Sequence, residues 1–148
     1  MIEEKYIEDY LNQLESDVLS DHFLKESEFV NYLNSDVFTS LNDDEKRILF
    51  FCCEVLYNAT RLSKNEAPEI NLDQFFANEE NNWSVREDYS SWSETKDIFF
   101  KDSPEEDLLA FVEDILADDE ESLSEISKEI IFITSKSLIE SFQFSAEP

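Results

Sequence analysis

The sequence of 148 residues contains no glycine. P-loops, dinucleotide-binding turns, the nucleophile elbow of hydrolases and the standard EF-hand calcium loop all need glycine, because each requires a positive φ angle or a close approach of the backbone. The lack of glycine also removes the Asn-Gly, Asp-Gly and Gly-X turns that most two-residue β-hairpins use. These motifs are therefore excluded, and the missing hairpin turns favour a helical protein.

Basic residues and histidine are scarce. The chain has 11 Lys and Arg residues against 37 Asp and Glu residues, which gives a net charge of −26, and its one histidine is His22. A single histidine excludes a histidine-rich metal site within one chain. The charge argues against direct binding of nucleic acid or an anionic membrane, since each would repel the protein. We expect no cofactor and no metal.

Long apolar runs are also missing. The longest run, Ile48 to Cys53, has six residues, far fewer than the roughly 20 that a membrane-spanning helix needs. The N-terminal residues show no basic segment followed by an apolar one, so no signal peptide is evident. The neighbouring cysteines, Cys52 and Cys53, are typical of buried thiols in a reducing compartment. Together these features predict a cytoplasmic protein.

The residues that are present support a folded core. Hydrophobic residues make up 41 % of the chain and aromatic residues 14 %, with 13 phenylalanines, whereas disordered acidic segments have few aromatic residues. A chain of this length is most simply one domain. We therefore expect a single acidic, all-helical domain over residues 1–148.

Apolar residues recur at helical spacing along most of the chain. The pattern predicts helices at roughly 2–19, 25–34, 43–62, 104–117 and 123–142, and a short helix through Phe75 and Phe76. The helix over 43–62 is apolar on most sides, which is typical of the centre of a bundle. Residues 78–97 have no clear pattern and stay unassigned. The sequence thus predicts an all-α fold, a compact bundle or orthogonal array of five to seven helices with a buried central helix near 43–62.

Several helix ends carry capping signals. Asn42 precedes three acidic residues and predicts a helix start. Asn65 can supply the left-handed residue that glycine usually provides at a helix end. Ser103 with Glu106 has the spacing of a capping box, and Ser122 begins a second example of the same pattern.

Acidic residues concentrate between Lys101 and Lys128, where eleven acids and no base occur. Two series run through this segment at a spacing of seven residues: Glu106, Glu113, Glu120 and Asp107, Asp114, Glu121. Seven residues are close to two helical turns, so members of one series within 104–117 share a helix face about 10.5 Å apart. Such a double row resembles the charges of a nucleic-acid backbone and would steer the protein toward a basic surface. The alternative is an acidic coat that serves solubility alone.

Two tryptophans, Trp83 and Trp92, stand in the polar segment 78–97. Aromatic residues among polar neighbours are common anchors at protein interfaces, although burial in the bundle is the alternative. The candidate partner-binding residues are therefore Glu106, Asp107, Glu113, Asp114, Asp118, Glu120, Glu121, Trp83 and Trp92.

No catalytic signature is present, so the sequence predicts a protein that is not an enzyme. In charge and helicity the chain is similar to acidic helical inhibitors, namely nuclease-immunity proteins, antitoxins and DNA mimics. This similarity implies a protein that covers the basic, nucleic-acid-binding surface of a protein partner such as a nuclease, a toxin or a nucleic-acid-binding complex. The alternative is a structural or adaptor domain that dimerises or binds a helix through an apolar face. The sequence does not fix the oligomeric state.

Overall fold

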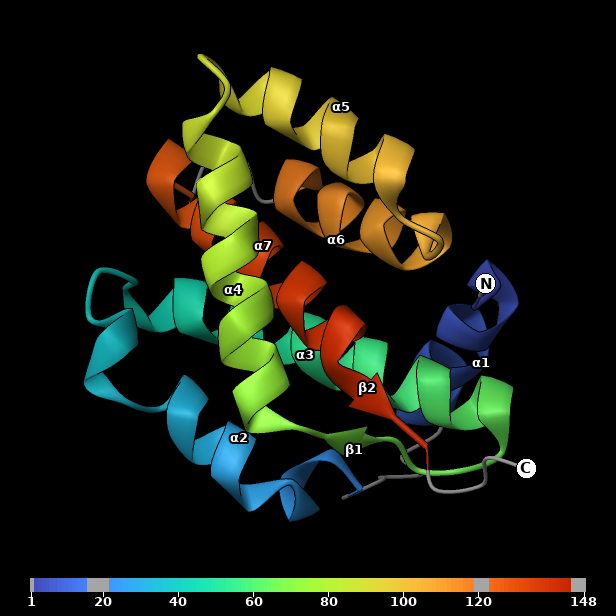
Figure 1. Ribbon diagram of the computed structural model, residues 1–148. Coiled ribbons are helices and arrows are strands. Elements are labelled where there is room, and N and C mark those ends of the chain that lie inside the picture. Colours follow the sequence, from blue (N-terminus) through green and yellow to red (C-terminus); the bar gives the residue numbers. More distant parts are fainter. Residues whose placement is uncertain (1, 16–21, 119–122, 145–148) are drawn as a thin grey trace.

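The computed structural model describes residues 2–15, 22–118 and 123–144 (Figure 1). These residues form seven α-helices, two 3-10 helices and two short strands. In chain order the elements are α1 (Glu4–Glu15), η1 (Phe23–Lys25), α2 (Ser27–Leu33), η2 (Asp36–Phe38), α3 (Asp43–Lys64), β1 (Glu69–Ile70), α4 (Leu72–Glu87), α5 (Trp92–Asp102), α6 (Glu106–Asp118), α7 (Glu125–Ser141) and β2 (Phe142–Gln143). The predicted all-α fold is confirmed. Residues 16–19 of the first predicted helix lie outside the described residues.

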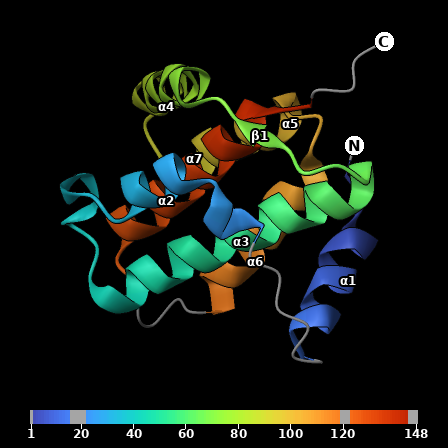
Figure 2. The same cartoon turned by 90° about the horizontal axis from the view of Figure 1, so that it is seen from below.

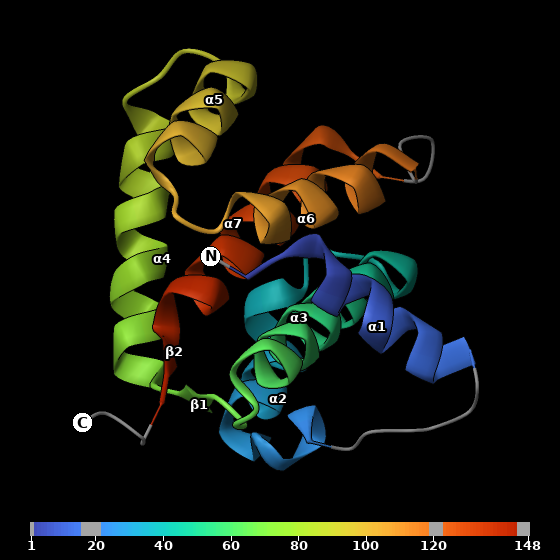
Figure 3. The same cartoon turned by 90° about the vertical axis from the view of Figure 1, so that its right-hand side faces the viewer.

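Helices α3 and α7 form the centre of the array. They pack against each other, α1 packs on α3, and α4 and α6 pack on α7. Helices α4 and α1 lie on opposite sides of this central pair (Figures 2 and 3). The predicted central helix is therefore one of two, and α7 is the more completely covered, because every residue from Ile131 to Ile139 is buried.

The complete burial of α7 cannot be recognised from the sequence, because polar residues occupy part of the centre of this helix. Thr134, Ser135, Lys136 and Ser137 are all buried. Small hydroxyl side chains can lie inside a protein when they bond to the preceding turn of their own helix. Here the Ser137 hydroxyl donates to the Ile133 carbonyl oxygen at 2.8 Å. A polar run in a sequence is therefore compatible with a buried helix.

The predicted caps of α3 are confirmed. The Asn42 side chain accepts a hydrogen bond from the backbone N–H of Glu45, and the Glu45 carboxylate accepts one from the N–H of Asn42, each at 2.9 Å. At the other end Asn65 has φ 53° and ψ 34°, the left-handed conformation. Because the chain has no glycine, asparagine fills this position, which it tolerates better than most residues.

The predicted cap at Ser103 is wrong in detail. Its hydroxyl accepts the N–H of Glu105 at 3.0 Å, and α6 starts later, with the Leu109 N–H donating to the Glu105 carbonyl oxygen. The proposed cap residue Ser122 lies outside the described residues. Ser124 caps α7 instead, since its hydroxyl accepts the N–H of Ser127 at 3.1 Å.

The unassigned segment 78–97 is mostly helical. The short helix predicted through Phe75 and Phe76 extends over all of α4, and α5 follows after a short connection. The apolar periodicity is weak because the only buried residues of α4 are Phe75 and Asn82. Asn82 instead makes polar contacts with α7, where its side-chain amide donates to the Ser137 hydroxyl at 3.0 Å.

The two strands form a small antiparallel pair that joins the chain after α3 to the end of α7. Glu69 is opposite Gln143, and Ile70 is opposite Phe142. This pair was not predicted, since two residues are too few to produce a recognisable alternation. Within the described residues, no helix is both long and apolar enough to cross a membrane.

Aromatic residues form two clusters in the core. The first gathers around Phe29, Tyr32 and Phe75, whose ring centroids are 5.0 to 6.3 Å apart. The second joins Trp92, Phe99 and Phe100 to Phe132 of α7. Both cysteines are buried thiols that form no disulfide. Burial raises the pKa of the Cys53 thiol, which keeps it in the unreactive thiol form.

Candidate protein-binding groove

A groove with a volume of about 390 Å³ lies between α1 and α6. Half of its lining residues are apolar and half are acidic. The apolar lining residues are Ile7, Leu11, Ala110 and Phe111, and the acidic ones are Glu4, Glu8, Asp107 and Asp114. We call this the α1–α6 groove. It brings together two helices that are about 100 residues apart in the chain.

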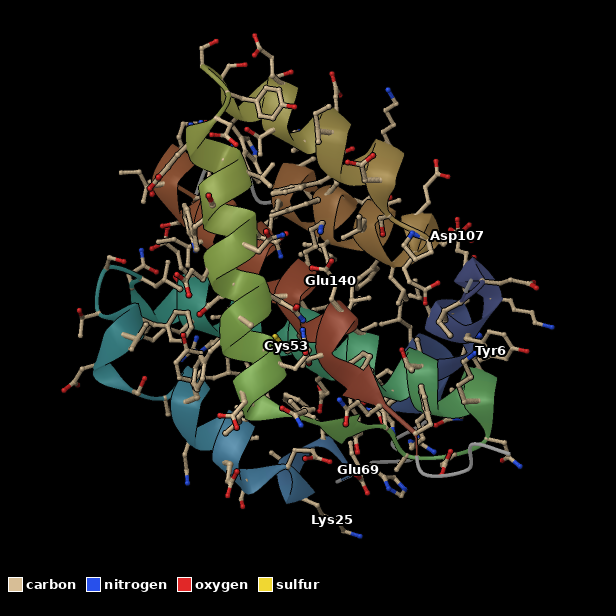
Figure 4. The ribbon with its side chains drawn as sticks, in the orientation of Figure 1. Tyr6, Lys25, Cys53, Glu69, Asp107 and Glu140 are labelled. Atoms are coloured by element: carbon tan, nitrogen blue, oxygen red, sulfur yellow. The ribbon has the colours of Figure 1, made fainter. Side chains whose placement is uncertain are left out.

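Acidic side chains around the start of α6 hold the backbone around the start of α1. The Glu4 N–H donates to the Asp107 carboxylate at 3.0 Å, and the Ile2 N–H donates to the Glu105 carboxylate at 2.8 Å. The N–H groups at a helix start have no partner within the helix, and a carboxylate there is favoured by the helix dipole. Figure 4 shows Asp107 beside the start of α1. These contacts fix one end of the groove.

The apolar lining combines buried and accessible residues. Ile7 belongs to the core, with 2 % of its surface exposed. Leu11, Ala110 and Phe111 are half-buried, and the Phe111 ring lies 6.3 Å from the Phe51 ring of α3. The groove is therefore supported from below by the central helices and keeps apolar surface that a partner can cover.

The acidic lining makes the groove strongly negative. Glu4, Glu8 and Asp114 are exposed, and Asp107 is half-buried. In the part of the chain that the structure describes, no lysine or arginine lines it. Charges of one sign over a low-dielectric surface concentrate the electric field and attract ligands of the opposite sign. The groove thus suits a ligand that is apolar and positively charged.

The structure separates the predicted acidic residues of α6. Asp107 and Asp114 line the α1–α6 groove, whereas Glu113 faces α5 and forms an ion pair with Lys96 at 3.2 Å. Glu106 and Asp118 are exposed outside the groove. Because Asp107 and Glu113 have partners within the protein, the expected double row is partly engaged in holding helices together. Glu120 and Glu121 lie outside the described residues, so the continuation of the rows stays a prediction.

The two tryptophans are half-buried and pack against the core. The Trp92 ring meets the rings of Phe132 and Phe99 edge-on, at 5.4 and 6.2 Å. Neither tryptophan lines the α1–α6 groove. Their role as anchors for a partner therefore stays a prediction.

Sequence reasoning missed the wall of the groove that α1 provides. The helical spacing of the apolar residues does predict the first helix, which contains Ile7 and Leu11 as well as Glu4 and Glu8. What the pattern lacks is any sign that α1 and α6 are neighbours, because helix periodicity reports only local structure.

The described residues contain no group of three or more His, Cys, Asp or Glu side chains that could hold a metal ion. Three glutamates, Glu26, Glu54 and Glu79, have a raised pKa, in each case mainly because burial disfavours the charged form. They lie on different helices or loops, and the Glu79 carboxylate accepts a hydrogen bond from the Tyr32 hydroxyl at 3.0 Å. These raised pKa values therefore make the stability of the fold depend on pH.

We expect the protein to become more stable as the pH is lowered from 7 to about 5. A carboxyl group with a raised pKa binds more protons in the folded state than in the unfolded state, so the free energy of unfolding increases as pH falls toward the ordinary pKa of 4.5. Partial neutralisation of the excess negative charge acts in the same direction. Urea denaturation at several pH values measures the effect.

The variant Glu79→Gln serves as the control for this pH dependence. It keeps an acceptor for the Tyr32 hydroxyl but cannot ionise, so it should be more stable than the parent at pH 7 and differ less at lower pH. Glu45 should not mask the effect. Burial acts to raise the pKa of the Glu45 carboxyl, but hydrogen bonds from Ser127 and from backbone N–H groups outweigh it and lower the pKa. The stability that Glu45 contributes is therefore lost mainly as the pH falls below 4.5. A steady loss of stability from pH 7 to about 5 would contradict the prediction.

Residues 9–79 match a family model described as the Vacuolar 14 Fab1-binding region. The matched segment runs from α1 into α4 and contains all of α2 and α3. No curated protein and no solved structure matches the chain. Over this segment the chain is similar to a protein-binding region, which supports a helical protein-interaction domain. The match gives no support to the interpretation as an immunity protein, a nuclease inhibitor or a DNA mimic.

Proposed function

We propose that this protein is an adaptor domain that binds an amphipathic helix of a protein partner in the α1–α6 groove. The observation that carries the proposal is the lining of the groove, with four apolar and four acidic residues and no base among the described residues. The apolar lining fits the adaptor interpretation of the sequence. The acidic lining adds that the partner helix is basic beside its apolar stripe.

A helix is the natural occupant because two helices form the walls. A third helix can place apolar residues spaced i, i+3, i+4 and i+7 between them, as in other helix-in-groove complexes. Lysine and arginine also suit these walls, since their apolar stems can cover Leu11 and Phe111 while their charged ends reach Glu8 and Asp114.

The apolar and acidic residues have different roles in this proposal. Burial of apolar surface supplies most of the favourable free energy of binding. The exposed carboxylates of Glu8 and Asp114 act mainly on the association rate and on the orientation of the partner. Asp107 is half-buried, so salt screens its charge less, but one of its carboxylate oxygens already accepts a hydrogen bond from the Glu4 N–H. We therefore choose Glu8 and Asp114 for substitution.

The description of the matching family names Fab1 as the bound protein, so a Fab1-type protein is the first partner to test. Of the groove residues, Leu11 lies within the matched segment 9–79, whereas the α6 wall lies outside it. The proposal predicts that the partner binds through a helix with one apolar face and basic residues beside that face.

The test measures the fluorescence anisotropy of a labelled helical peptide with leucines at i, i+3, i+4 and i+7 and flanking lysines and arginines. The double variant Glu8→Gln, Asp114→Asn should bind this peptide about tenfold more weakly, and added salt should weaken binding to the parent protein. Ala110→Trp, which fills the groove without adding charge, should reduce binding further.

Controls separate the groove from the overall charge. The variant Glu80→Gln, Glu87→Gln removes two exposed carboxylates of α4, outside the groove, and should leave binding nearly unchanged. A peptide with glutamates in place of its basic residues should not bind. Equal binding by the groove and control variants would overturn the proposal, and so would equal binding of the basic and acidic peptides.

A further inference from the structure

The two walls of the α1–α6 groove run in the same general direction. On each helix the lining residues are spaced i, i+3, i+4 and i+7: Glu4, Ile7, Glu8 and Leu11 on α1, and Asp107, Ala110, Phe111 and Asp114 on α6. The Glu4 N–H donates to the Asp107 carboxylate, so both series begin at the same place. Figure 3 shows the two helices diverging from this end. The groove therefore has a closed end, where α1 and α6 begin, and an open end, where they finish.

Positive groups offset the acids at the closed end. The carboxylates of Glu105 and Asp107 accept hydrogen bonds from the N–H groups of Ile2 and Glu4, at 2.8 and 3.0 Å. The first N–H groups of a helix carry a partial positive charge, and both α1 and α6 begin here. Within the described spans of these two helices the only base is Lys5, in the first turn of α1. The closed end therefore attracts a cation less strongly than the number of its acidic residues would imply.

The open end has no such compensation from its own helices. Asp114 lines the groove there, and Asp118, the last residue of α6, is exposed. As the structure describes them, neither α1 nor α6 has a base in its last turn. The last carbonyl groups of a helix carry a partial negative charge, which basic side chains usually offset. These helix ends add to the carboxylates, so the negative potential increases along the groove from the closed end to the open end.

Bases on the neighbouring helices α3 and α5 leave this difference in place. Arg47 of α3 pairs with Asp44 at 3.4 Å, and Lys96 of α5 pairs with Glu113 at 3.2 Å. An ion pair has no net charge, so neither pair offsets the acids of the groove. Lys46 of α3 lines a separate pocket, which shares no lining residue with the α1–α6 groove. The difference between the two ends is therefore set by α1 and α6.

We infer that the partner helix carries its basic residues at one end, and that this end lies beside Asp114 at the open end of the groove. The other end of the partner helix is uncharged and lies over Ile7 and Ala110, toward the closed end. Lysines gathered at one end meet the most negative part of the groove, whereas lysines spread evenly do not. This inference rests on the proposed function, because it specifies which amphipathic helices the groove prefers.

Three peptides of equal composition test this inference on the full chain. All carry leucines at i, i+3, i+4 and i+7 and the same number of lysines, which are placed in the first turn, in the last turn or evenly along the helix. In fluorescence anisotropy the two clustered peptides should bind about threefold more tightly than the even peptide, because their charges meet the strongest field. Lysines in the first turn weaken a free helix, so circular dichroism of the free peptides corrects for differences in helix content.

A nitroxide label on the peptide reports where its basic end lies. Attached to the basic end of either clustered peptide, the label should broaden the backbone NMR signals of Asp118 more than those of Asp107, which lie at opposite ends of α6. The two clustered peptides should therefore bind in opposite directions. Labels on the uncharged ends should give the reverse pattern.

Two single variants are the matched controls. Asp114→Asn and Glu4→Gln each remove one exposed carboxylate from the groove lining. Asp114→Asn should weaken binding of the clustered peptides about threefold, and Glu4→Gln by less than about twofold. Equal binding of clustered and even peptides, or equal broadening at both ends of α6, would overturn this inference while the proposed function stands. If none of the three peptides binds, the proposed function fails and this inference fails with it.

Discussion

Phe132→Ala is expected to lower the free energy of unfolding by about 3–5 kcal/mol. Phe132 is completely buried in α7. Its ring lies 5.4 Å from Trp92, 6.2 Å from Phe99 in a stacked arrangement, and 5.9 Å from Phe100. Removing the ring loses the transfer free energy of its atoms and leaves a space that three aromatic neighbours cannot easily fill.

Urea denaturation of the parent and the variant measures this loss. Phe76→Ala is the matched control, because Phe76 is 42 % exposed and meets Tyr32 and Phe75 only at the edge of the first aromatic cluster. Phe76→Ala should lower the free energy of unfolding by only about 1 kcal/mol, because a partly buried ring contributes less to stability. Similar losses for the two variants would show that Phe132 does not hold α5 on α7 in the way described.

The second large effect concerns a polar network between α4 and α7. The buried Lys136 ammonium donates to the Asn82 side-chain oxygen at 3.0 Å, pairs with Glu140 at 3.1 Å and lies 4.8 Å from the centre of the Phe99 ring. The Asn82 amide donates to Ser137 and Glu140 at 3.0 and 2.9 Å. In Figure 4, Glu140 lies on α7 where it faces α4.

We expect Asn82→Ala and Lys136→Met each to destabilise the protein by about 2–3 kcal/mol, because each leaves buried polar groups without their partners. The double variant should cost less than the sum of the two, by about 1 kcal/mol or more, since the second substitution removes a group that the first left unsatisfied. Urea denaturation of the parent, the two single variants and the double variant measures these free energies of unfolding. Strict additivity would mean that the two residues act independently.

Features that depend on neighbouring residues in the chain were predictable. The periodicity predicted α1, α2, α3, α6 and α7, and the signals at Asn42 and Asn65 located both ends of α3. Helix α5 and most of α4 were missed, since α4 packs on α7 partly through Asn82 rather than through an apolar stripe. Polar contacts of this kind leave no periodic signal.

The candidate site was predictable only in part. Asp107 and Asp114 were predicted from their spacing to bind a partner, and both line the α1–α6 groove; their role in binding stays a prediction. The sequence could not show that Glu113 would face Lys96 of α5, or that Glu4 and Glu8 would complete the acidic lining. Both outcomes depend on which helices pack together, and that is decided by contacts between residues distant in the chain.

The attachment of α1 to α6 has a consequence for the order of synthesis. Glu105 and Asp107, which accept the N–H groups of Ile2 and Glu4, follow the matched segment 9–79 in the chain. A nascent chain that has emerged only as far as α4 therefore lacks both these acceptors and one wall of the groove. On the ribosome, the α1–α6 groove would therefore be complete only after α6 has been made and has docked on α1.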